Sequence, residues 1–238
     1  MVIKLRGITR TFIFKVAFGR RHAKDLKKEA KLYEGKLHPL CGKAVPIYYG
    51  YYMGETYEGL TGVMMLEDCG RPLRVPLRQQ PIYFRGTVLT HLIDIHRAGV
   101  ALDAFGLGHI VATKVPGTDD KLFPVIIDFL DANDAHKCEY EGDFTFYEPI
   151  PYPTEVACSQ IWRAFMDADT FWPRYVSFFG KDIPVEYAKS VETLKEHGNP
   201  REGTSQYLID RTAYVVVKDY YDWRVERKRY DQGKARTE

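Results

Sequence analysis

The stretch "IHRAGVALDAFGLGHIVA", residues 95–112, joins a helical pattern to a strand pattern near the middle of the chain. Upstream of it, residues 83–99 carry apolar side chains at steps of three and four. This spacing predicts a helix that ends at Gly99, because glycine adopts the left-handed conformation common after helices. Downstream, "GHIVATKV" (108–115) is short and rich in β-branched residues, which predicts a strand. Helices and short strands together indicate an α+β protein.

Four elements are predicted on the N-terminal side of this stretch. The aromatic and β-branched "TFIFKVAF" (11–18) is typical of a strand. "AKDLKKEAKLYEGKL" (23–37) has apolar residues at helical spacing and predicts an amphipathic helix. "AVPIYYGYYMG" (44–54) and "GLTGVMMLED" (59–68) predict two strands joined by a glycine-containing, acidic turn. The expected order is therefore strand, helix, strand, strand.

The C-terminal side is expected to be mostly helical. It begins with a strand at "LFPVIIDF" (122–129), which follows the turn-rich "PGTDDK" (116–121). After the proline-rich "PIPYPTE" (149–155), "VACSQIWRAFMDAD" (156–169) has a helical period. The remainder is aromatic and helix-like and closes with "TAYVVVKDYYDWRVERKRY" (212–230).

Composition narrows the class of protein. With 238 residues and 45% hydrophobic content the chain can bury a sizeable core. Its 34 basic and 32 acidic residues give a net charge of +2, which favours neither nucleic acid nor an acidic membrane as a partner. No apolar run approaches the roughly 18 residues of a membrane span, so we expect no membrane partner.

The cysteine pattern and the N-terminal composition bear on location. Four cysteines stand far apart and never form a CxxC pair: Cys41, Cys69, Cys138 and Cys158. Reduced thiols in an intracellular protein, cytoplasmic or nuclear, are therefore expected. The first 24 residues contain seven basic residues and no acidic one, as transit peptides do, but "TFIFKVAF" within them favours a mature strand.

Seven short segments carry a resemblance to a known family: "FIFKVA", "KKEAKLYEGKL", "VPIYYGYYMG", "GVMMLEDCG", "IHRAGV", "VIIDF" and "AHKC". In this order and spacing, over residues 11–160, they resemble the short, divergent protein kinase-like proteins of mushroom-forming (basidiomycete) fungi, with a looser echo in the C-terminal "VKDYYDWR". The resemblance implies a two-lobed kinase-like fold. Residues 1–70 would form a reduced N-terminal lobe of one sheet and one helix, and residues 71–238 a mostly helical C-terminal lobe.

The resemblance also implies a site for ATP and Mg²⁺. Lys15 would bind the phosphates, and Glu29 would hold Lys15 in place, with Glu34 as the alternative partner. A surface lysine on an edge strand is the plain structural alternative for Lys15. Glu67 falls in the segment that matches the hinge and is a further nucleotide-binding candidate. Asp128, directly after a buried strand, matches the acid that binds the metal.

The opening stretch keeps the family's apolar register but not its polar residues. Leu102 stands where the resemblance implies a histidine, Ala104 where it implies the catalytic aspartate, and His109 where it implies the metal-binding asparagine. Alanine cannot accept a proton, and imidazole is a poor ligand for Mg²⁺, which prefers oxygen. His109 is therefore a weak metal candidate, and Asp103 is a displaced candidate for the lost catalytic acid.

The glycine-rich hairpin that covers the phosphates in this family is reduced or missing. Gly7 is the only glycine before Lys15, although close approach of backbone N–H groups to phosphates requires glycine. Nucleotide binding is therefore expected to be weakened or absent.

Other residue patterns indicate structural roles. His91 and His96 lie five apart on the predicted helix and miss the i, i+4 spacing of a zinc helix. His136 and Cys138 alternate as "HKC", but no second pair is close in sequence, which favours a structural interpretation. The basic C-terminal helix, with Trp223 and Tyr230 in it, is interpreted as a solvated helix rather than a nucleic-acid surface.

Three functions remain open from the sequence. The favoured one is a pseudokinase that acts as a binding or scaffolding module for a protein partner, through exposed Tyr and Trp residues. The alternative is a weak ATP-dependent phosphotransferase that uses Lys15, Glu29, Asp128 and the displaced Asp103. The third is a truncated, decaying paralogue whose fold persists without activity.

Overall fold

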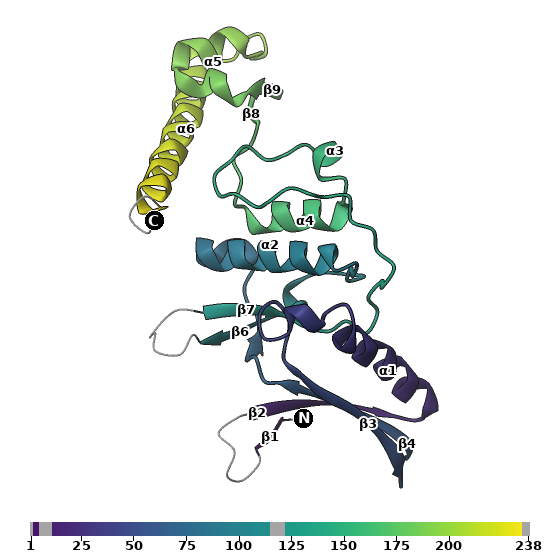
Figure 1. Ribbon diagram of the computed structural model, residues 1–238. Coiled ribbons are helices and arrows are strands. Elements are labelled where there is room, and N and C mark those ends of the chain that lie inside the picture. Colours follow the sequence, from purple (N-terminus) through teal and green to yellow (C-terminus); the bar gives the residue numbers. More distant parts are fainter. Residues whose placement is uncertain (1, 5–10, 115–121, 235–238) are drawn as a thin grey trace. The chain divides into compact units, whose positions relative to one another are not determined.

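The computed structural model describes residues 2–4, 11–114 and 122–234. The chain has an α+β fold and divides into two compact units (Figure 1). Unit 1 comprises Met1–Phe144 and Pro153–Thr170, and unit 2 comprises Thr145–Tyr152 and Phe171–Glu238. The lobe boundary predicted near residue 70 lies inside unit 1.

A four-stranded antiparallel sheet forms the N-terminal part of unit 1. Its strand order is β1-β2-β4-β3, with β1 Val2–Lys4, β2 Thr11–Phe18, β4 Gly59–Glu67 and β3 Tyr48–Thr56. Helix α1 (Arg20–Glu34) packs against it and is followed by the short helix η1 (His38–Leu40). Leu26, Ala30 and Tyr33, at helical spacing, are buried on the face of α1 that contacts the sheet.

A smaller antiparallel sheet and two helices complete unit 1. The sheet has the order β5-β6-β7, with β5 Arg71–Pro72, β6 Ile110–Lys114 and β7 Leu122–Ile126. Helix α2 contacts β7 and also α4. The helical elements are η2 Leu77–Gln79, α2 Ile82–Arg97, η3 Leu107–His109, α3 Pro153–Val156 and α4 Ser159–Ala168.

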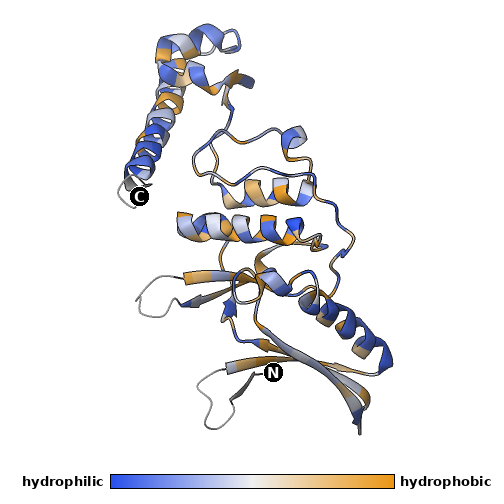
Figure 2. Ribbon diagram, in the orientation of Figure 1, coloured by the Kyte–Doolittle hydropathy of each residue, from blue (hydrophilic) through white to orange (hydrophobic). Residues whose placement is uncertain are grey.

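The apolar side chains of unit 1 concentrate where these elements meet. Leu92 and Ile95 of α2 and Ile161 and Phe165 of α4 are almost completely buried, and so is Met64 in the central strand β4. In Figure 2 the strand β7 and the helix α4 carry much of the hydrophobic colour. Burial of these side chains supplies the main stabilisation of the unit.

Unit 2 is built around a hairpin and a long helix. Its elements are β8 Tyr175–Phe178, β9 Lys181–Pro184, η4 Val185–Lys189, α5 Val191–His197 and α6 Gln206–Lys234. Phe178, Ile183, Leu194 and Ala213 form a buried cluster that joins the hairpin to both α-helices. None of the helices in the described ranges has the length and apolar character needed to cross a bilayer.

Most predicted elements are confirmed, and some expectations are corrected. The strands predicted at 11–18 and 59–68 form within one residue of their bounds, but the β8–β9 hairpin arises in a region expected to be helical. Of the Tyr and Trp residues expected to be exposed, several tyrosines are, among them Tyr57 and Tyr207, but the tryptophans are not. All three tryptophans are partly buried, and Trp172 stacks on Trp223 with ring centroids 4.6 Å apart. Gly7 and the predicted turn at 116–121 lie outside the described residues.

Candidate functional site

Three charged side chains from distant parts of unit 1 meet at one ammonium group. Lys15 Nζ donates to Glu29 Oε1 at 2.8 Å and Oε2 at 3.1 Å, and to Asp128 Oδ1 at 2.6 Å. An ammonium group has three N–H donors, so these contacts engage all of them. Lys15, Glu29 and Asp128, called here the Lys15 cluster, were all predicted as site residues, and the structure brings them together.

The local structure explains why these side chains converge. Lys15 lies in the middle of β2, opposite Met64 of the neighbouring strand β4. Glu29 projects from the buried face of α1, beside Ala30 and Leu26. Asp128 follows β7 in the left-handed conformation (φ 68°), which aspartate tolerates better than most residues. Strand, helix and turn thus each contribute one charged group.

The burial of the three groups differs sharply. Glu29 is 1% exposed, whereas the side chains of Lys15 and Asp128 are 27% and 51% exposed. Burial lowers the pKa of Lys15, but the nearby charges and hydrogen bonds of Glu29 and Asp128 outweigh burial, so the pKa of Lys15 is raised. The cluster therefore holds one positive and two negative charges, with Asp128 on its solvent-exposed side.

The packed rings of Phe129 and Tyr33 form the buried floor of the Lys15 cluster. The backbone N–H of Phe129 donates to Glu29 Oε1 at 3.0 Å, which ties the turn at Asp128 to helix α1. The Phe129 ring packs edge-on against Tyr33, with centroids 5.7 Å apart. Burial raises the pKa of Tyr33 well above its ordinary value, so the phenol stays neutral. The carboxylate of Glu29 is thus held by two partners above an apolar floor.

Two further acidic candidates lie outside the cluster. Glu34 accepts a hydrogen bond from the Tyr48 hydroxyl at 2.6 Å, so Glu29 and not Glu34 is the partner of Lys15. Glu67 Oε2 accepts from the Ile47 N–H at 3.4 Å and from the Cys69 thiol at 3.8 Å. Burial, with the charge of Glu67, raises the pKa of Cys69 to about 12. The contacts of Glu67 hold the end of β4 and reach no member of the Lys15 cluster.

The loop between α2 and β6 contains the other predicted residues. Asp103 is exposed and lines a cavity of about 160 Å³ with Ser159, Arg163 and Asp167. In the described part of the chain, no hydrogen bond or ion pair connects Asp103 to Lys15 or Asp128. Ala104, at the position implied for the catalytic base, is exposed. The phosphotransfer base has no counterpart in the Lys15 cluster itself.

His109 is close in the fold to the turn that carries Asp128. Its carbonyl oxygen accepts from the Ile127 N–H at 2.9 Å, so its backbone lies beside the residue that precedes Asp128. Its ring atom Nδ1 is buried without a hydrogen-bond partner within the described ranges. Among those ranges, no group of three or more His, Cys, Asp or Glu ligand atoms forms around Asp128. A metal ion at Asp128 would therefore take most of its oxygen ligands from water or from a bound phosphate.

A second group of potential metal ligands was not predicted from the spacing of His and Cys residues in the sequence. His136 and Cys138 were interpreted as structural because no second pair is near them in sequence. The structure brings His96, from α2, and Cys158, from the start of α4, to the same point. Such long-range convergence leaves no local pattern in the sequence.

Comparison with protein-family models gives no match, and comparison with curated protein sequences gives none either.

Proposed function

We propose that this chain is a kinase-like pseudokinase: a binding module that retains a weak site for Mg²⁺·ATP and lacks the catalytic base of phosphoryl transfer. The observation that carries the proposal is the Lys15 cluster. A lysine on a strand, a glutamate from the adjacent helix and an aspartate in a turn after a strand are the parts that kinases use to hold phosphates and metal.

The charge of the cluster determines how a nucleotide would bind. Lys15 is engaged by two carboxylates, so the cluster has a net charge of −1 and repels phosphate by itself. Mg²⁺ prefers carboxylate and phosphate oxygens, and Asp128, 51% exposed, is the group that would bind it. With the metal on Asp128, Lys15 would turn a donor toward phosphate while Glu29 keeps it in place. Nucleotide binding is therefore expected to require Mg²⁺.

The absence of a base in the cluster favours a binding role over catalysis. Phosphoryl transfer needs a residue that orients the attacking hydroxyl and accepts its proton. Ala104 cannot do this, and the exposed Asp103 lines a different cavity, formed with α4. The phosphotransferase hypothesis thus loses Asp103 as its candidate for the catalytic base. The residues proposed to bind phosphate and metal, those of the Lys15 cluster, are unaffected.

We expect ATP with Mg²⁺ to raise the melting temperature of the protein. At a nucleotide concentration about five times the Kd, mass action stabilises the folded state by about 1 kcal/mol. For a chain of this size that corresponds to a shift of about 2–4 °C. The measurement is a thermal-shift titration with ATP, with and without Mg²⁺, on the wild type and on Asp128→Asn.

The variants separate a true site from general salt effects. Asp128→Asn keeps the size of the side chain but removes the negative charge that attracts the metal, so its curve should be much flatter than that of the wild type. Asp131→Asn, an exposed aspartate three residues further on, should respond as the wild type does. A flat wild-type curve up to millimolar Mg²⁺·ATP would remove the nucleotide site from the proposal. Phosphate transfer abolished by Asp103→Asn would overturn the pseudokinase assignment.

The exposed face of α1 is the surface we propose for a partner. Basic side chains line a depression of about 650 Å³ together with Met53 and Leu60: Arg20, Lys24, Lys27, Lys28 and Lys31. Met53 is 52% exposed. Positive charge around apolar side chains is complementary to an acidic protein segment that carries apolar residues.

Charge reversal on this face should weaken the binding of an acidic, leucine-containing peptide by roughly ten-fold, because each exposed charge pair contributes up to about 1 kcal/mol. The double variant Lys27→Glu/Lys31→Glu tests this by fluorescence anisotropy of a labelled peptide. The matched control, Lys181→Glu/Lys189→Glu, changes two exposed lysines of unit 2. Equal weakening in both variants would mean that only overall charge matters.

A further inference from the structure

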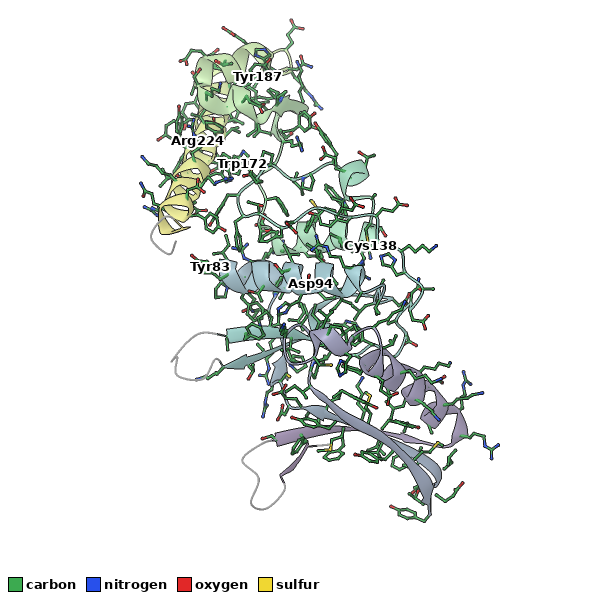
Figure 3. The ribbon with its side chains drawn as sticks, viewed as in Figure 1. Tyr83, Asp94, Cys138, Trp172, Tyr187 and Arg224 are labelled. Atoms are coloured by element: carbon green, nitrogen blue, oxygen red, sulfur yellow. The ribbon has the colours of Figure 1, made fainter. Side chains whose placement is uncertain are left out.

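Four side chains that bind metals converge inside unit 1. They are His96 near the end of α2, His136 and Cys138 in the chain after β7, and Cys158 immediately before α4. One ligand atom from each lies within 4.8 Å of all the others. Cys138 is labelled in Figure 3. His96 and Cys158 are buried, and the other two are partly buried.

The distances among the ligand atoms of His96, His136 and Cys158 fit a single ion with tetrahedral geometry, and the Cys138 ligand atom lies within 4.8 Å of all three. His96 Nδ1 lies 3.0 Å from His136 Nε2, and Cys158 Sγ lies 3.5 Å from His96 Nδ1 and 3.9 Å from His136 Nε2. Around a tetrahedral Zn²⁺, bond lengths of about 2.1 Å to nitrogen and 2.3 Å to sulfur give edges of about 3.4 Å between nitrogens and about 3.6 Å between nitrogen and sulfur. The observed edges differ from these values by about 0.4 Å or less.

A neighbouring amide holds His96 in the form that binds metal. Gln160 Oε1 accepts from the Leu102 N–H at 3.2 Å, while its Nε2 donates to the Leu102 carbonyl oxygen. These two bonds fix which end of the amide is the oxygen. His96 Nε2 lies 2.6 Å from this oxygen and must donate to it. The lone pair of His96 is thus on Nδ1, which faces the other three ligands.

The surrounding chain indicates a structural role for such an ion. The segment between β7 and α3 contains neither helix nor strand. It includes His136 and Cys138, and an isolated backbone bridge links it to the loop after α2 through Ala101 and Asn133. An ion bound by all four side chains would fasten this segment to α2 and α4, two helices that pack against each other in the unit.

We propose that His96, His136, Cys138 and Cys158 form a structural Zn²⁺ site. Thiolate and imidazole ligands in a tetrahedral arrangement select zinc over Mg²⁺ or Ca²⁺, which require oxygen. All four positions are filled by the protein, so none remains open for a reacting water, as a catalytic zinc needs. The site is independent of the nucleotide site, because it shares no residue with the Lys15 cluster.

The first test is the zinc content of the purified full chain, measured by inductively coupled plasma mass spectrometry after dialysis. We expect about one zinc per chain for the wild type, in keeping with a four-ligand site, and less than about a tenth of that for Cys138→Ser/Cys158→Ser. Cys41→Ser is the matched control, since Cys41 is a free, partly buried cysteine outside the cluster. It should retain the full zinc content. A wild type that holds no zinc after zinc addition, or a double variant that keeps it, overturns the proposal.

A second measurement does not depend on whether the cysteine variants fold. Replacement of zinc by Co²⁺ in the wild type should give the strong visible absorption and the thiolate charge-transfer band of tetrahedral cobalt. Gln160→Ala should weaken zinc affinity by about 10- to 100-fold in a chelator competition, because it frees the ring of His96. If the four side chains only form hydrogen bonds with one another, neither the cobalt bands nor an effect of Gln160→Ala on zinc affinity will be seen, and the proposal fails.

Discussion

Replacing Glu29 with alanine should lower the free energy of unfolding by about 3 kcal/mol. Glu29 is 1% exposed and accepts bonds from Lys15 and from the Phe129 N–H. Its removal leaves a half-buried ammonium and a buried N–H without their main acceptor. The loss falls at the low end for a broken buried ion pair, since Lys15 keeps Asp128 and some contact with solvent. Urea denaturation followed by circular dichroism measures it.

The same helix offers a matched control. Glu34→Ala removes an exposed carboxylate with one hydrogen bond, from Tyr48, and should cost less than about 1 kcal/mol. The double variant Lys15→Met/Glu29→Leu replaces the pair with apolar side chains and should recover much of the stability lost in Glu29→Ala. If Glu29→Ala and Glu34→Ala cost the same, the burial of the Lys15–Glu29 pair contributes nothing measurable to stability.

Phe129→Ala should be at least as costly, with a loss of about 3–5 kcal/mol in the free energy of unfolding. The ring is 1% exposed and packs edge-on against the fully buried Tyr33, so its removal leaves a cavity between α1 and the turn after β7. The neighbouring core cannot close such a space without moving the helix. The expected result is a lower urea midpoint without a change in the slope of the transition.

Leu130→Ala is the natural control for this position. Leu130 is the next residue in the chain and is 44% exposed, so its truncation should cost less than about 1 kcal/mol. A similar loss for Phe129→Ala and Leu130→Ala would contradict the packing described for the floor of the Lys15 cluster.

Local patterns in the sequence predicted the first unit well. Strand β2 is rich in aromatic and β-branched residues around Lys15, and helix α1 buries one face at helical spacing. The β8–β9 hairpin was missed because its strands have four residues each, which is too short for a period to be recognised among aromatic neighbours. Its buried side chains, Phe178 and Ile183, pack with α5 and α6, which are distant in sequence.

The two sites differ in how far the sequence could predict them. Lys15, Glu29 and Asp128 were selected from the resemblance to kinase-like proteins, in which each of these residue types has a recognisable place in its element. The site formed by the His and Cys side chains was not predicted from the sequence. Residues 96, 136 and 158 are separated by intervals of forty and twenty-two residues, and only the fold brings them together. Spacing rules for metal sites detect pairs on one turn or one hairpin, and this site has only one such pair.

The interleaving of the two units has a consequence for how the protein can be divided. The chain passes between them three times, after residues 144, 152 and 170, so unit 2 consists of two separate segments. The segment 145–152 is bound to the rest of its unit by Trp172, whose N–H donates to Glu148 O at 2.9 Å, and by Arg227, which pairs with the Glu148 carboxylate at 2.7 Å. A single cut after residue 170 would therefore leave part of unit 2 on each fragment. Recombination could not transfer unit 2 as one contiguous module without also moving residues 153–170 of unit 1.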